Sequence, residues 1–132
     1  METASARAAA FWTALLLLIL LVLSQLVVRQ RFKARVSVGD GGVEPLFLAS
    51  RAFGNCAEYA GPGIGALAVL ALVQASPWAI HAVGGLLTLG RVIHAVALSL
   101  TTKPNRFRAA GMVMTWLALI FAIVTLLFYA IG

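Results

Sequence analysis

Three polar residues inside an otherwise apolar stretch have the types and spacing to form a binding site. Arg51, Asn55 and Glu58 are separated by four and three positions, so on a helix of 3.6 residues per turn they share one face. An arginine or glutamate in the middle of a membrane-spanning helix costs roughly 2.5–3.5 kcal/mol on insertion scales. A chain that keeps such groups on one face is therefore expected to build a polar site inside a helix bundle.

A second polar pair, Arg91 and His94, is spaced by three residues and also shares one helical face. Together with Arg51 it supplies more cation than the single carboxylate of Glu58 can neutralise. Such a cluster suits a small anionic ligand with carboxylates and an amine, because arginine binds carboxylates with two parallel hydrogen bonds and glutamate binds an ammonium group. The structural alternative pairs Glu58 with Arg91 and uses Asn55 as a hydrogen-bonding contact between helices.

The elements that position these residues are long apolar helices. The chain has 132 residues, is 62% hydrophobic and has a mean hydropathy of +1.01, values far above those of a soluble domain. Each apolar run is long enough for a helix to cross the hydrocarbon core; the four runs are 8–28, 46–75, 77–100 and 109–131. We therefore expect an all-α membrane protein, with one four-helix transmembrane domain over residues 1–132.

The first run could also be a signal peptide. It is longer than the apolar part of a signal peptide, no small-residue cleavage site closes it, and a basic segment that begins at Arg29 follows it directly. We therefore expect it to remain as a spanning helix.

Positive charge is concentrated between the first and second runs and between the third and fourth. The net charge is +6, and with four crossings these two loops lie on the same side of the membrane. The positive-inside rule makes that side cytoplasmic and both termini external, as in a multi-pass protein of a bacterial inner membrane. The basic excess thus needs no nucleic acid partner. We expect no metal site, and the lone Cys56 excludes an intrachain disulfide.

The two polar pairs are expected at the same depth. Counted from the cytoplasmic face at 1.5 Å per residue, Arg51, Asn55 and Glu58 lie roughly 8, 14 and 18 Å deep. The third helix runs in the opposite direction, which puts His94 roughly 9 Å and Arg91 roughly 14 Å below the same face. The groups could meet within one subunit or across an interface.

The segment Arg51-x-x-x-Asn55-x-x-Glu58-Tyr59 resembles the signature of the MAPEG family, the membrane-associated proteins in eicosanoid and glutathione metabolism. Two further segments, Arg35-Val-Ser37 with the glycines that follow it and Gly90-Arg91-Val-Ile-His94, resemble parts of the bacterial branch of that family. The resemblance covers nearly the whole chain. It implies a trimer of four-helix subunits, with glutathione bound between neighbouring subunits near the cytoplasmic side.

The resemblance also assigns roles to individual residues. Glutathione, as co-substrate, would be contacted by Arg31, Arg51, Asn55, Glu58, Tyr59, Arg91 and His94. Either Arg106 or Arg108 would hold its thiol as thiolate, since a thiol with a pKa of about 8.5 is mostly protonated at neutral pH and a nearby cation lowers that value. The thiolate would attack a hydrophobic electrophile or a lipid peroxide that reaches the site from the membrane lipids. The implied function is that of a membrane-embedded glutathione transferase or peroxidase in detoxification.

Some positions depart from the family pattern. Phe53 stands where a histidine or glutamine is usual, and Pro62 lies one residue later than the usual proline. The second tyrosine of the eicosanoid-synthesising members is missing, so leukotriene or prostaglandin synthesis is not implied. Two alternatives remain: a non-catalytic member that binds a lipid or another ligand, and a small four-helix drug exporter. The exporter would need a membrane-buried acid in the first helix, but the run 8–28 contains no acid, and Ser24 and Gln25 do not replace one.

Overall fold

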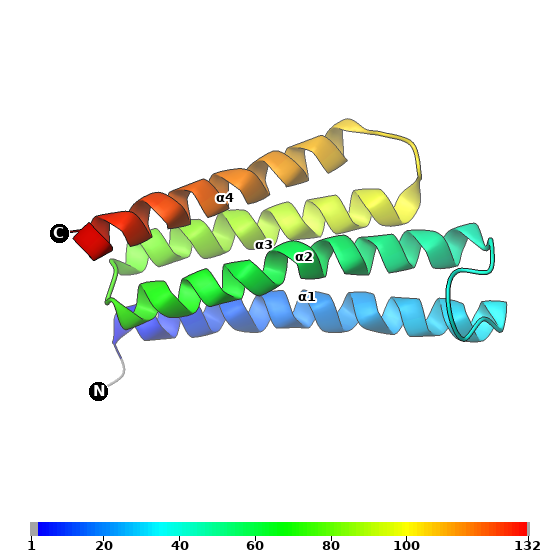
Figure 1. Cartoon of the computed structure of the whole chain (residues 1–132), viewed down its shortest axis with the longest axis horizontal. Coiled ribbons are helices and arrows are strands. Elements are labelled where there is room, and N and C mark those ends of the chain that lie inside the picture. The colour runs from blue at the N-terminus through cyan, green and yellow to red at the C-terminus, as the bar shows by residue number, and fades with distance from the viewer. Residues whose placement is uncertain (1–2, 132) are drawn as a thin grey trace.

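The computed structural model describes residues 3–131 and contains four helices joined by short loops (Figure 1). The helices are α1 (Ala4–Ala34), α2 (Glu44–Leu72), α3 (Pro77–Leu100) and α4 (Arg106–Ile131). No strand occurs within the described part of the chain. The predicted all-α class is confirmed.

Three of the helices, α1, α3 and α4, are long and apolar enough to cross a membrane. The α2 helix is also long, at 29 residues, but it does not satisfy the same test of length and apolarity. Its polar residues and glycines account for this difference. Because α2 packs against the apolar helices α1 and α3 (Figure 1), its polar side chains are brought to the depth of the membrane.

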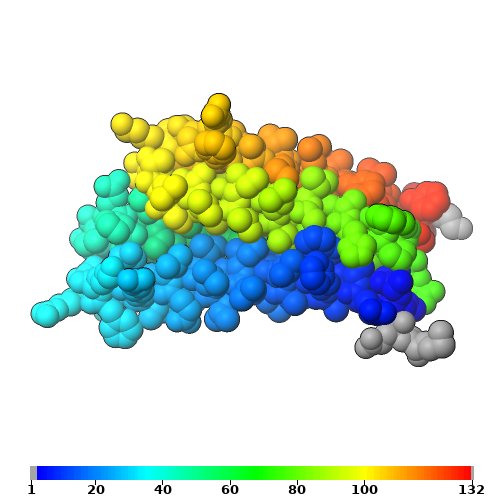
Figure 2. Space-filling model, turned by 180° about the vertical axis from the view of Figure 1, so that it is seen from behind, coloured from blue at the N-terminus to red at the C-terminus, as the bar shows by residue number. Residues whose placement is uncertain are grey.

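The α2 and α3 helices form the middle of the bundle. The α1 helix packs on both of them, and α4 packs mainly on α3, while α1 and α4 do not touch within residues 3–131. Seen from behind, α3 is consequently visible between α1 and α4 (Figure 2). The α3 helix therefore keeps one narrow face open between its two neighbours.

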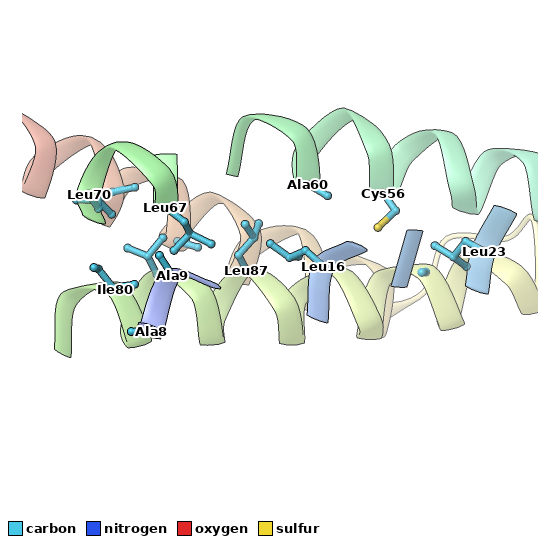
Figure 3. Packing of buried hydrophobic residues seen from close by; sticks show 14 of the residues in the cluster. Ala8, Ala9, Leu16, Leu23, Cys56, Ala60, Leu67, Leu70, Ile80 and Leu87 are labelled. Carbon is cyan, nitrogen blue, oxygen red and sulfur yellow. The ribbon is translucent and has the colours of Figure 1, made fainter. Parts of the chain in front are cut away.

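The core is a thin line of aliphatic side chains where α1, α2 and α3 meet (Figure 3). Leu16, Leu67 and Leu87 are fully buried there, and Cys56 is buried among them. Most other large apolar side chains on α1 and α4 are exposed, as expected for helices that face lipid. Cys56 is thus a small packing residue of the core.

The end of the bundle that carries both termini is tied together by hydrogen bonds. The hydroxyl of Ser5 in α1 donates to the carbonyl of Ala75 at 2.6 Å, and the backbone N–H of Ser76 donates to the hydroxyl of Tyr129 at 3.1 Å. Both bonds hold the short loop between α2 and α3. The two longer loops lie at the other end (Figure 1).

The α1–α2 loop turns through three glycines with positive φ, which are Gly39, Gly41 and Gly42. The side chain of Asp40 accepts a hydrogen bond from the N–H of Gly42 at 2.9 Å, which stabilises this turn. Pro77 opens α3, because its missing N–H is not needed in the first turn of a helix.

The placement of the basic residues in loops was wrong. Arg29, Arg31 and Lys33 belong to the end of α1, and Arg106 and Arg108 belong to the first turn of α4. The apolar runs mark only the part of a helix that suits lipid, whereas arginine and lysine are good helix formers and continue the helix beyond it.

Candidate functional site

Arg51 and Glu58 lie on a face of α2 that no other helix of the subunit covers. Both side chains are exposed, and Asn55 and Tyr59, between and beside them, are half-buried. We call Arg51, Asn55 and Glu58 the polar face of α2. Gly65 continues this face one heptad beyond Glu58, is exposed, and has no atom within 4 Å of a Cβ built on it. This side of α2 thus carries the charged side chains of Arg51 and Glu58 and, at Gly65, a stretch of backbone that no other helix of the subunit covers.

Arg91 of α3 is fully buried, with an exposed fraction of 0%. Its Nη1 donates to the side-chain oxygen of Asn55 on α2 at 2.9 Å, and its Nε donates to the hydroxyl of Thr115 on α4 at 2.9 Å. Its guanidinium also lies over the ring of Tyr59, 4.9 Å from the ring centroid. One side chain therefore joins α2, α3 and α4.

The partners of Arg91 are neutral. Within residues 3–131 its hydrogen bonds go to Asn55, Thr115, the carbonyl of Gly111 and the sulfur of Met112. The ion pair with Glu58 that the structural alternative predicted is not among them. Hydrogen bonds from a charged group stabilise by about 1.5–3 kcal/mol each, and here they compensate for the burial of the charge.

Two glycines allow Arg91 to reach α4. A Cβ on Gly111 would lie 2.7 Å from the carbonyl oxygen of Gly90 and 2.7 Å from the backbone nitrogen of His94. A Cβ on Gly90 would lie 2.8 Å from the carbonyl oxygen of Gly111. The backbones of α3 and α4 consequently touch at this level, and His94 is buried against the same contact.

Arg31 has a local partner. Its Nη1 donates to the backbone carbonyls of Ser37 and Gly39 at 3.2 and 2.9 Å, so this arginine braces the α1–α2 loop. A guanidinium has five N–H donors, and within residues 3–131 only Nη1 of Arg31 makes hydrogen bonds.

Arg106 and Arg108 lie at the same end of the bundle as the α1–α2 loop (Figure 1). Arg106 is exposed and stacks over the ring of Phe107 at 5.2 Å. Arg108 is half-buried, and its Nη1 donates to the carbonyl of Thr102 at 3.4 Å. Asn105 caps the helix by accepting from the backbone N–H of Arg108 at 2.9 Å.

The structure divides the predicted cluster into two parts. Asn55, Tyr59 and Arg91 meet inside the subunit, which is one of the two arrangements that the equal depth of Asn55 and Arg91 left open. Arg51 and Glu58 are exposed instead, and within residues 3–131 neither makes a side-chain hydrogen bond to that group. Thr115 and Gly111 were missed in the sequence, although the pair Gly111-x-x-x-Thr115 is the small-residue spacing of a helix contact.

The open face of α3 carries an apolar groove. Two adjoining pockets of about 640 and 410 Å³ share Val92, Val96 and Leu100, with walls from α4 on one side and α1 on the other. We call this surface the α3 groove. It offers an apolar molecule a place beside the bundle, at the end where α4 begins.

These features define an all-helical integral membrane protein with a polar face at membrane depth. The sequence model of the MAPEG family matches residues 9–128. The chain also resembles the inner membrane protein YecN of Escherichia coli strain K12 and of strain O6:H1, with 34% identity over 120 residues in each case, 91% of this chain and 90% of the relative. No solved structure matches the chain. The chain therefore belongs to the MAPEG family.

Proposed function

We propose that this protein binds glutathione on the polar face of α2 and uses it as co-substrate against lipophilic electrophiles or lipid peroxides. The observation that carries the proposal is the exposure of Arg51 and Glu58 on one face of a helix within the bundle. Charged groups at this depth are too costly to leave against lipid. They need either a polar ligand or a second protein surface.

The donors and acceptors on this face match glutathione, which has two carboxylates, one ammonium and a thiol. The guanidinium of Arg51 suits a carboxylate, and the carboxylate of Glu58 suits the ammonium. Asn55 uses its side-chain oxygen for Arg91, so its amide N–H groups remain as donors for the ligand. Membership of the MAPEG family supports the same ligand.

The exposed polar face also supports an oligomer, which we propose to be a trimer. The exposed glycines of α2 offer the close helix approach that membrane interfaces favour. The basic residues near the two longer loops favour a cytoplasmic position for that end. The resemblance to an inner membrane protein supports the bacterial inner membrane as the location.

Arg106 and Arg108 are the cations proposed to stabilise the thiolate. Both stand in the first turn of α4, where the helix dipole adds to their positive field. A lowered thiol pKa gives more thiolate at neutral pH. The thiolate sulfur then bonds to the electrophile while the leaving group departs from it. The α3 groove, which ends beside Phe107, is a suitable place for the electrophile.

A second candidate is a non-catalytic member that binds a lipid or ligand. One observation favours this candidate: Arg91 is fully buried, and its guanidinium is hydrogen-bonded to partners within the subunit. The role of Arg91 can therefore be purely structural. Glutathione binding to the purified protein, measured by isothermal titration calorimetry, tests the ligand assignment. Arg51→Ala or Glu58→Gln should weaken binding about tenfold or more, while Arg29→Ala, at the end of α1, serves as the matched control. Unchanged affinity in an assembled Arg51→Ala variant would place the site elsewhere.

A further inference from the structure

We propose that a pocket at the terminal end of the bundle, formed by Arg7 and His81, binds the phosphate group of an anionic membrane lipid. The pocket has a volume of about 450 Å³ and is lined by Ala4, Arg7, Ala8, Phe11 and His81. It lies at the opposite end of α1 from the loop braced by Arg31. It is thus separate from the polar face of α2.

The proton position on His81 is fixed by a neighbour. The indole Nε1 of Trp12 donates a hydrogen bond to Nδ1 of His81 at 3.0 Å. Because Nδ1 accepts this bond, the proton of the neutral imidazole is carried by Nε2. His81 therefore offers an N–H donor on the side away from Trp12.

The position of Trp12 is itself built by the sequence of α3. A Cβ on Gly84 would lie 2.2 Å from Cγ of Trp12, and a Cβ on Gly85 would lie 3.6 Å from the far edge of the indole. Because the two glycines have no side chains, the indole of Trp12 packs directly against the backbone of α3. This arrangement holds His81 beside α1, next to Arg7.

Within residues 3–131 the charge at this end of the bundle is positive. Arg7 and His81 are both exposed, and within residues 3–131 the guanidinium of Arg7 makes no hydrogen bond. The acids of that part of the chain, Asp40, Glu44 and Glu58, belong to the far loop and to α2. Arginine binds phosphate with two parallel hydrogen bonds, and Nε2 of His81 adds a third donor.

The surroundings favour a lipid over a free anion. The α1 helix is a candidate membrane span, so its first turns lie at the level of lipid head groups. Phe11 lines the pocket, is 53% exposed and packs edge-on against Trp12. Aromatic side chains at this level are typical of the membrane interface. The pocket thus combines phosphate donors with an apolar wall for the start of an acyl chain.

The test is native mass spectrometry of the full-length protein, exchanged into detergent with equal amounts of phosphatidylglycerol and phosphatidylcholine. Wild-type protein should retain phosphatidylglycerol preferentially. Arg7→Gln and His81→Ala should each reduce that preference about tenfold, corresponding to roughly 1.4 kcal/mol. His81→Gln keeps an N–H donor and should retain most of the preference for phosphatidylglycerol. Arg7→Lys keeps the positive charge and should retain part of that preference.

Arg29→Gln removes an exposed arginine from the other end of α1 and should leave lipid retention unchanged. Each variant is compared by size-exclusion profile and thermal unfolding, so that a folding defect is recognised, and the two conservative variants carry the test if His81→Ala unfolds. Equal loss in Arg29→Gln, or no loss in Arg7→Gln, would overturn the proposal. Full displacement of the lipid by millimolar inorganic phosphate would show a free-anion site and would also overturn it.

Discussion

The side-chain oxygen of Asn55 accepts a hydrogen bond from Nη1 of Arg91 at 2.9 Å, which ties the polar face of α2 to the buried centre of the bundle. Arginine can only donate, so this bond fixes which end of the Asn55 amide points inward. The N–H groups of the amide are not used by this bond. Arg91 is in this sense a positioning residue for Asn55.

Asn55→Asp should separate the structural role of Asn55 from its role in ligand binding. An aspartate would still accept from Arg91, as an ion pair, so we expect the unfolding temperature to stay the same or to rise. Glutathione affinity should fall about tenfold or more, because the N–H donors are lost and a negative charge faces a carboxylate. Calorimetry and thermal unfolding on the same sample give both values. An unchanged affinity would remove Asn55 from the ligand site.

Gly111→Ala should destabilise the subunit. The new methyl group would meet the backbone of α3 at Gly90 and His94, so the helices must separate and the bond from Arg91 to Thr115 must lengthen. Overpacking of this kind costs about 1–3 kcal/mol. The matched control is Ala110→Val, since Ala110 is the exposed neighbour of Gly111 on α4. Denaturant titration gives the free energy of unfolding, and equal values for the two variants would contradict the α3–α4 contact.

Gly65→Leu should disrupt the oligomer while the subunit stays folded. Gly65 continues the polar face of α2, and a leucine there would hold a neighbouring subunit away. We expect size-exclusion chromatography with light scattering to show a smaller assembly and circular dichroism to show unchanged helix content. Ala10→Leu, at an exposed position of α1, is the control. A full-size assembly of Gly65→Leu would exclude this face as the subunit interface.

Arg108→Ala should raise the pKa of bound glutathione more than Arg106→Ala does. Arg108 is half-buried and Arg106 is exposed, and water screens the charge of an exposed group more strongly. A cation lowers the thiol pKa, so its removal should move thiolate formation to higher pH, by about one unit for Arg108. Thiolate absorbance against pH measures this. If neither variant shifts the titration, neither arginine alone activates the thiol.

The apolar runs were sufficient to predict the four helices, and the bounds of α3 were predicted correctly at Pro77 and Leu100. A proline at the start and a polar Thr-Thr-Lys-Pro segment at the end mark these limits in the sequence. The ends of α1 were not predicted, because basic residues end the apolar run without ending the helix. The length of an apolar run follows the thickness of the membrane core, whereas the helix itself can continue beyond the membrane.

The equal depth of Asn55 and Arg91 was also predictable, because the rise per residue and an antiparallel arrangement place both at the same level. Their contact within one subunit was one of two arrangements that the sequence left open. The exposure of Arg51 and Glu58 could not be predicted from the sequence. The rotation of each helix about its own axis depends on packing against its neighbours, as at Gly90 and Gly111. The part played by Thr115 depends on the same contact.

The polar face of α2 is proposed to bind glutathione, and the basic residues nearby are proposed to ionise its thiol. Titration of the purified, detergent-solubilised protein with glutathione at neutral pH, with thiolate absorbance followed in the ultraviolet, tests both points at once. We expect a saturable rise for the wild-type protein, and no such rise for Arg51→Ala in the same concentration range. Binding without a thiolate signal would support the non-catalytic alternative. The absence of any binding to the wild-type protein would contradict the proposed function and leave Arg51 and Glu58 as residues of a subunit interface.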